Sequence, residues 1–130
     1  NRMFYSQLKL HPGTKTINPE TGIVDNYESP HWEPIFARMS GLPGGYDFGC
    51  QRCSWFSHFL TDFAGDDGFL TELDFRLRKP NILNDITWIN GTVTEIDKEA
   101  SIVSIAIEAR NQLDELTASA IGRVRLPSKN

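Results

Sequence analysis

The chain has 130 residues, of which 39% are apolar, 23% charged and 11% aromatic, and its formal net charge is −4. This length and apolar content suit a single globular domain over residues 1–130 and exclude a chain that is disordered throughout. An acidic balance gives no general attraction to phosphate backbones, so we expect no nucleic-acid partner. No apolar run approaches the roughly 20 residues of a membrane-spanning helix, so we expect no membrane partner. Two cysteines make no disulfide framework and the sequence opens without a basic and apolar leader, so we expect a cytoplasmic protein.

The first third of the chain is rich in proline and glycine, which interrupt helices and strands. We expect residues 1–24 to form an irregular N-terminal extension, with a short strand at residues 3–10. A short helix is predicted over residues 32–40, because Ile35, Phe36 and Met39 recur at helical spacing.

The longest predicted helix covers residues 48–63. Its large apolar side chains recur at intervals of three and four residues, which places them on one helix face: Phe56, Phe59, Leu60 and Phe63. A stripe of this length needs a broad apolar surface to cover it. The glycines and aspartates of residues 65–68 are expected to end the helix.

Four strands joined by short turns are predicted after this helix, at residues 73–78, 86–96, 101–109 and 116–126. Gly91 lies inside the second strand, where a bulge or a close backbone approach is the usual reason for a glycine. Small residues share one face of the last strand and would let the helix lie close to it. A long helix followed by an antiparallel meander is an α+β plan whose open edges often pair with another chain.

The segment from His31 to Gly49 resembles the hydratase motif of the MaoC-like (R)-specific enoyl-CoA hydratases and dehydratases. The likeness rests on His31-Trp32-Glu33-Pro34-Ile35-Phe36-Ala37-Arg38, on Gly41-Leu42-Pro43 and on Gly49, eighteen positions after His31 as in the family. Three later segments of the chain also resemble the family pattern: Asn84-Asp85, Asn111-Gln112 with Glu115, and Val124-Arg125-Leu126-Pro127. The resemblance extends from about Asp25 to Pro127. It implies the hotdog fold, in which a curved antiparallel sheet of about five strands wraps a long central helix.

The resemblance also implies a reaction, the reversible hydration of a 2-enoyl-CoA to a 3-hydroxyacyl-CoA. In the family, a histidine and an aspartate hold one water between them and act as its general acid and base. His31 matches that histidine. Gly49 and Cys50 match the start of the helix that holds the thioester oxygen, where backbone N–H groups and the helix dipole stabilise negative charge. Ser57 matches a small polar residue that lines the family's site.

One position departs from the family pattern. Asn26 stands five residues before His31, where the family has the aspartate. An amide can orient a water by hydrogen bonding but takes up no proton at neutral pH, so His31 would carry the proton transfers. Asp25 is the alternative partner, although a shift of one residue along an extended segment turns the side chain to the opposite side. Glu28 is a third candidate carboxylate.

The remaining expectations concern cofactors, partners and rival functions. The CxxC motif at residues 50–53 has no second pair and no suitably spaced histidine, so we expect neither a metal nor a redox cofactor. Coenzyme A is expected only as part of an acyl-CoA substrate, whose acyl group the sequence leaves open. We expect a homodimer or a heteromer with another hotdog chain. Two other functions stay open, a non-catalytic subunit of a heteromeric hydratase and a hotdog acyl-CoA thioesterase.

Overall fold

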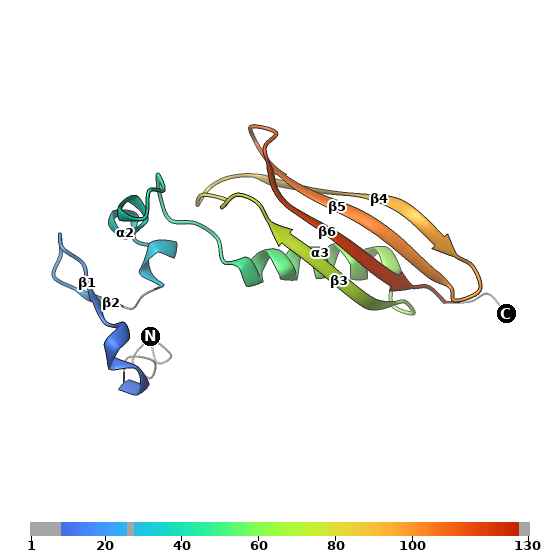
Figure 1. Ribbon diagram of the computed structural model, residues 1–130, viewed down its shortest axis with the longest axis horizontal. Helices are drawn as coiled ribbons and strands as arrows, with labels where there is room; N and C mark the ends of the chain where they lie inside the picture. The colour runs from blue at the N-terminus through green and yellow to red at the C-terminus, as the bar shows by residue number, and fades with distance from the viewer. Residues whose placement is uncertain (1–8, 26–27, 128–130) are drawn as a thin grey trace. The chain divides into compact units, whose positions relative to one another are not determined.

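The computed structural model describes residues 9–25 and 28–127. The chain divides into two compact units, Asn1–Tyr46 and Asp47–Asn130, and each is described by itself (Figure 1). In the part of the chain that is described, no helix combines the length and the apolar character that crossing a membrane requires.

The first unit is built from short elements: η1 (Pro12–Thr14), β1 (Thr16–Ile17), β2 (Val24–Asp25), η2 (Ser29–His31) and α2 (Pro34–Met39). β1 and β2 pair antiparallel. The helix predicted over residues 32–40 is confirmed as α2, which Pro34 begins and which ends just before Gly41, a residue with a φ of 81°. The strand predicted at residues 3–10 falls outside the described residues except for Lys9 and Leu10, which are helical.

The second unit consists of one long helix and one antiparallel sheet. Its elements are α3 (Gly49–Ala64), β3 (Phe69–Leu77), β4 (Thr87–Asp97), β5 (Ile102–Asn111) and β6 (Leu116–Arg125). The strand order is β3-β6-β5-β4, and α3 runs along one face of the sheet against β3 and β6 (Figure 1). The predicted long helix and four later strands are therefore confirmed, with small changes at their ends. Of the approximately five strands expected around the helix, the described residues show four in this sheet.

The core lies between α3 and the sheet. Phe56 and Leu60 are fully buried against apolar side chains of β5 and β6. A Cβ atom at Gly122 would lie 2.3 Å from Leu60 Cδ1, so the glycine is what allows the helix and β6 to come this close. A Cβ atom at Gly91 would lie 2.6 Å from Phe59 Cε1, so it is a side chain of α3, and not a backbone segment, that comes close to this glycine. The bulge in β4 lies further on, between Val93 and Glu95.

The buried face of α3 differs from the predicted stripe in one respect. Its buried residues recur every four positions: Arg52, Phe56, Leu60 and Ala64. Phe63, which the helical spacing assigned to the same stripe, is 45% exposed. The sheet covers α3 on the side of β3 and β6. Phe63, three residues after Leu60, therefore lies at the margin of the covered helix face.

Candidate functional site

His31 ends the 3₁₀ turn η2, and a backbone carbonyl fixes the direction of its ring. Its backbone N–H donates to the Glu28 carbonyl at 2.9 Å, which closes the turn. Its Nδ1 atom lies 2.8 Å from the carbonyl oxygen of Tyr46, and the two rings tilt against each other with centroids 4.3 Å apart. A carbonyl oxygen can only accept, so Nδ1 carries the hydrogen. In the neutral ring the basic lone pair is therefore on Nε2, the nitrogen required for proton transfer.

The turn that carries His31 is itself tightly held. The Ser29 carbonyl accepts hydrogen bonds from the backbone N–H groups of Trp32 at 3.1 Å and Glu33 at 2.7 Å. Glu33 then accepts a hydrogen bond from the side-chain amide of Asn18, at 3.3 Å. Asn18 is 5% exposed and ties the β1–β2 connection to this turn, because its Oδ1 also accepts from backbone N–H groups of that connection. Hydrogen bonds within the first unit thus hold the turn that carries His31.

The structure describes one of the two candidate partners of His31. Asp25 is the last residue of that strand, and its backbone pairs with Thr16 of β1. Asn26 lies outside the described residues. The choice between Asn26 and Asp25 therefore stays a prediction. Glu28, the third carboxylate, is the N-cap residue of η2 and contributes its carbonyl oxygen to the His31 N–H.

The first turn of α3 has backbone donors that no side chain caps. Phe48 is the N-cap residue, and its carbonyl accepts from the N–H groups of Gln51 at 3.1 Å and Arg52 at 3.4 Å. Within the described part of the chain, the N–H groups of Gly49 and Cys50 make no hydrogen bond. The helix dipole adds positive potential at this end, so these two N–H groups can hold an anionic or strongly polarised oxygen.

Gly49 also has a packing role. A Cβ atom at this position would lie 2.9 Å from Leu77 Cδ1, at the end of β3. Leu77 is 50% exposed and its terminal methyl group can move. The space next to the Gly49 backbone is thus limited by one flexible side chain, which is compatible with close approach of a ligand.

Ser57 and the two cysteines lie further along α3. The Ser57 hydroxyl donates to the Cys53 carbonyl one turn earlier, at 2.9 Å, so this hydroxyl is occupied within the helix. Cys50 is exposed, Cys53 is half-buried, and both are free thiols. The described residues contain no group of three or more histidine, cysteine or acidic side chains arranged to hold a metal ion.

A buried charge cluster at the N-terminal end of α3 is absent from the sequence predictions. Arg52 is 3% exposed, and its guanidinium donates to both carboxylate oxygens of Asp47, with Nη2 2.7 Å from Oδ1. Its Nη1 donates to the Thr117 carbonyl at 2.6 Å. A signal was present in the sequence, because Arg52 precedes Phe56 by four residues and thus shares its buried helix face.

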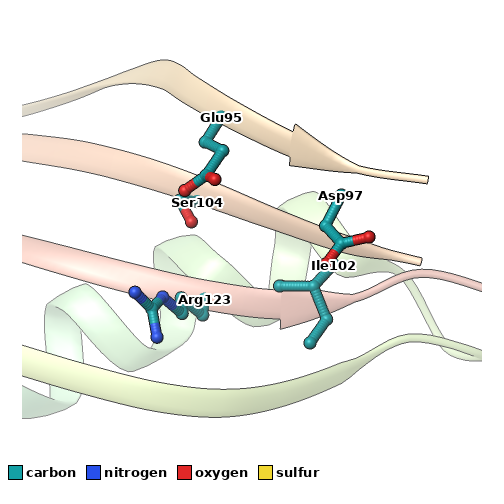
Figure 2. A pocket seen from close by; sticks show the side chains of 5 residues that line it. All are labelled: Glu95, Asp97, Ile102, Ser104 and Arg123. Carbon is teal, nitrogen blue, oxygen red and sulfur yellow. The ribbon is translucent and has the colours of Figure 1, made fainter. Parts of the chain in front are cut away.

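The opposite face of the sheet has two hollows that contain none of the predicted site residues. Figure 2 shows the first, of about 230 Å³, whose lining side chains point away from α3: Glu95, Asp97, Ile102, Ser104 and Arg123. Arg123 also forms an ion pair with Glu72 at 3.0 Å. The second hollow, of about 430 Å³, includes Arg76 of β3 and Arg78, which follows the end of that strand. Both are open to solvent and charged side chains contribute to the lining of each, so neither is the enclosed apolar pocket that an acyl chain needs.

Comparison with known proteins identifies the architecture. No protein-family model and no curated protein matches the sequence. Among solved structures, the ChsH1-ChsH2 complex from Mycobacterium tuberculosis matches with a TM-score of 0.71 and 18% identity, over 78% of this chain and 77% of that chain. An (R)-hydratase from A. caviae involved in PHA biosynthesis matches with a TM-score of 0.70 and 20% identity, over 76% of each chain. The DHNA-CoA thioesterase from Staphylococcus aureus matches with a TM-score of 0.53 and 13% identity, over 62% of each chain. The chain has the hotdog fold, in an α+β arrangement of one long helix and an antiparallel sheet.

Proposed function

We propose that this chain adds water across the double bond of a 2-enoyl-CoA, giving a 3-hydroxyacyl-CoA, and catalyses the reverse dehydration. The proposal combines the motif around His31 with the likeness of the fold to an (R)-hydratase. The observation that carries it is the hydrogen bond from His31 Nδ1 to the Tyr46 carbonyl. This bond leaves Nε2 as the base of the neutral ring, which is what activation of a water requires.

His31 has the acid–base task in this proposal. Its Nε2 atom takes a proton from the water as the water oxygen bonds to C3 of the substrate. The electron pair of the double bond moves toward the thioester carbonyl, and C2 then receives a proton from the imidazolium. A positioned acid–base group of this kind accelerates a reaction by about 10²–10⁴-fold.

The first turn of α3 has the task of stabilising the thioester oxygen. Negative charge develops on that oxygen as the water attacks C3. The N–H groups of Gly49 and Cys50 make no hydrogen bond within the described residues, and the helix dipole favours an anion at this end. Donors that are already oriented stabilise the transition state without a cost of reorganisation. Ser57 is proposed to line the acyl site, and no metal or redox cofactor takes part.

Asn26 is the first choice for the residue that holds the attacking water, and Asp25 is the second. An amide at position 26 can accept a hydrogen bond from the water and so orient it toward C3. The histidine would then perform both proton transfers. Because His31 alone transfers protons, we expect a slower enzyme than one with an aspartate at position 26.

A second chain of the same fold is the proposed protein partner. β4 forms an edge of the sheet and pairs only with β5 among the described residues. Several of its apolar side chains are exposed, among them Trp88 at 50%, Val93 at 45% and Ile96 at 62%. A long edge strand with exposed apolar residues is a typical surface for pairing with another chain. We propose a homodimer or a heteromer of hotdog chains that buries this edge.

The alternative function is that of a non-catalytic subunit in such a heteromer. Asn26 in place of an aspartate favours it, and the similar structure from Mycobacterium tuberculosis is that of a complex, ChsH1-ChsH2. A hotdog thioesterase is the other alternative, because the DHNA-CoA thioesterase is also similar in structure.

A rate assay separates these functions. The purified chain is incubated with crotonyl-CoA and with a bulkier enoyl-CoA, and loss of the conjugated double bond and release of free thiol are followed in parallel. The proposal predicts hydration without thiol release. Hydration only after addition of a second hotdog chain, and insensitive to His31→Ala, would support the non-catalytic subunit. Thiol release without hydration would support the thioesterase.

A further inference from the structure

A buried ion pair brackets the first turn of α3. Asp47 comes two residues before Gly49, and Arg52 comes three residues after it. The Arg52 side chain is 3% exposed and the Asp47 side chain 9% exposed, so the two charges meet away from water. The guanidinium donates to both carboxylate oxygens, which is the strongest geometry available to an arginine and a carboxylate. The segment that carries the Gly49 and Cys50 N–H groups is therefore held at both ends.

The same pair attaches the first turn to the sheet. Arg52 Nη1 donates to the carbonyl of Thr117, near the start of β6. The Asp47 carboxylate accepts two hydrogen bonds from Asn81, one from the backbone N–H at 3.1 Å and one from the side-chain amide at 3.3 Å. The backbone N–H of Asp47 in turn donates to the Asn81 carbonyl at 3.0 Å. The Asn81 amide also donates to Thr87 Oγ1 at 3.1 Å. The helix start is thus linked to β6 and to the connection between β3 and β4.

The charges in this cluster affect the potential at the helix start. A buried carboxylate at Asp47 without a partner would place a negative charge two residues from Gly49. In a buried, weakly polarisable environment this charge would oppose the growth of negative charge on an oxygen held by the Gly49 N–H. Arg52 cancels that charge through two hydrogen bonds. The positive end of the helix dipole then remains available to a ligand.

We propose that Arg52 and Asp47 are positioning residues for the thioester carbonyl: together they fix the place of the Gly49 and Cys50 N–H groups and keep the potential there positive. The inference rests on the proposed function in so far as the carbonyl is that of an acyl-CoA. It does not depend on the reaction being hydration. Neither residue touches the substrate, and both act through the backbone of the first turn.

The test uses a thioester that the proposed reaction leaves intact. Butyryl-CoA has the thioester carbonyl but no double bond to hydrate. Its carbonyl stretch, measured by isotope-edited infrared difference spectroscopy, moves to lower frequency when the oxygen receives hydrogen bonds in a positive potential. We expect this downshift for the full-length wild-type chain. The kinetics of crotonyl-CoA hydration are measured on the same samples.

Three variants separate charge from position. Arg52→Met leaves the Asp47 carboxylate unpaired and is expected to lose most of the downshift. Arg52→Lys keeps a charge without the two-pronged geometry and should give an intermediate shift. Asp47→Asn combined with Arg52→Met removes both charges and should regain part of the shift, since buried pairs are often replaceable by neutral residues. Ile105→Val, a small change in the core away from α3's first turn, controls for lost stability and should keep the wild-type shift.

The hydration kinetics supply a second readout. We expect kcat to fall about 10- to 100-fold in Arg52→Met, toward the loss seen when one oxyanion donor is removed, while KM changes less. A purely structural role would leave the carbonyl frequency of the folded fraction unchanged. If folded Arg52→Met shifts the carbonyl frequency of butyryl-CoA as far as the wild-type chain does, the inference is overturned. If that variant does not fold, the same downshift in Arg52→Lys and in the double variant overturns it.

The outcomes also distinguish this inference from the proposed reaction. A carbonyl downshift that depends on Arg52, in a chain that hydrates no enoyl-CoA, supports the positioning role and contradicts the hydratase. Hydration with no carbonyl downshift in the wild type contradicts the positioning role and the use of the helix start, but not the task of His31.

Discussion

His31 donates a hydrogen bond from Nδ1 to the carbonyl oxygen of Tyr46, 2.8 Å away. Two consequences follow from this contact. The ring cannot rotate about its Cβ–Cγ bond without losing the bond, and the neutral ring has its lone pair on Nε2. A histidine held in this way is prepared to accept a proton from water, whereas an exposed histidine without such a bond exchanges between tautomers.

Replacing His31 by asparagine tests this arrangement. The asparagine amide can still donate to the Tyr46 carbonyl but has no basic nitrogen. We expect the rate of enoyl-CoA hydration to fall by about 10²–10⁴-fold while the thermal unfolding midpoint stays near that of the wild type. Steady-state kinetics and thermal unfolding check the two parts. Retention of most of the hydration rate would remove His31 from the catalytic machinery.

The identity of the water-holding residue is tested by a pair of substitutions. Asn26→Asp supplies the carboxylate that the resemblance implies at this position, so we expect a large rise in kcat for hydration. Asp25→Asn is the matched change at the neighbouring residue and should leave kcat near the wild-type value. An unchanged rate in Asn26→Asp together with a large loss in Asp25→Asn would assign the role to Asp25 instead.

The close approach of α3 to β6 predicts a stability difference between two glycines. A Cβ atom at Gly122 would lie 2.3 Å from Leu60 Cδ1, whereas nothing lies within 4 Å of a Cβ atom at Gly13. Gly122→Ala should lower the free energy of unfolding by about 1–3 kcal/mol, because it forces extra volume into a filled core. Gly13→Ala is the control and should have little effect. Urea unfolding measures both, and equal stabilities would show that Leu60 moves aside freely.

The hydrogen bonds of one surface cluster make its contribution to the stability of the fold depend on pH in the acidic range. The Lys79 ammonium, 2.6 Å from Glu115 Oε1, and the Asn111 amide, 2.9 Å from Oε2, lower the pKa of the Glu115 carboxyl. Because the pKa is lower in the folded chain, the cluster contributes its full stability above the ordinary glutamate pKa of about 4.3 and loses it as the pH falls through the folded value.

Lys79→Met checks this cluster. NMR titration of the side-chain carboxyl carbons should show the pKa of Glu115 moving up toward its ordinary value. Lys98→Met, in the turn after β4, is a charge-matched control and should leave Glu115 unchanged. An identical Glu115 titration in wild type and Lys79→Met would contradict the assigned cause.

The helix and the strands of the second unit could be predicted because their side-chain periods are local. Phe56 and Leu60 recur at helical spacing, and Val103, Ile105 and Ile107 alternate along a strand, so burial of one face follows from neighbours in the sequence. Phe63 shows the limit of such reasoning. Its exposure depends on how far the sheet extends across the helix, which no local period reports.

The candidate site could be predicted only where a motif marks it. The spacing of His31 and Gly49 indicated both residues, but the hydrogen bond that fixes the His31 tautomer comes from a backbone carbonyl, which has no sequence signal. In the sequence, Arg52 stands out only as an interior residue of a CxxC motif. Its burial requires Asp47 and Thr117, and Thr117 is 65 residues away along the chain. A charged residue in register with a buried helix face is the signal that would have found it.

The central claim is most directly tested by following the oxygen atom of water into the product. Crotonyl-CoA is incubated with the purified chain in water enriched in the heavy oxygen isotope, and the products are separated and analysed by mass spectrometry. We predict that the label appears in the 3-hydroxyl group of an intact (R)-3-hydroxybutyryl-CoA, and that His31→Asn forms this product about 10²–10⁴-fold more slowly. Label in a free carboxylate with release of coenzyme A, or labelled 3-hydroxyacyl-CoA formed equally well by His31→Asn, would contradict the account.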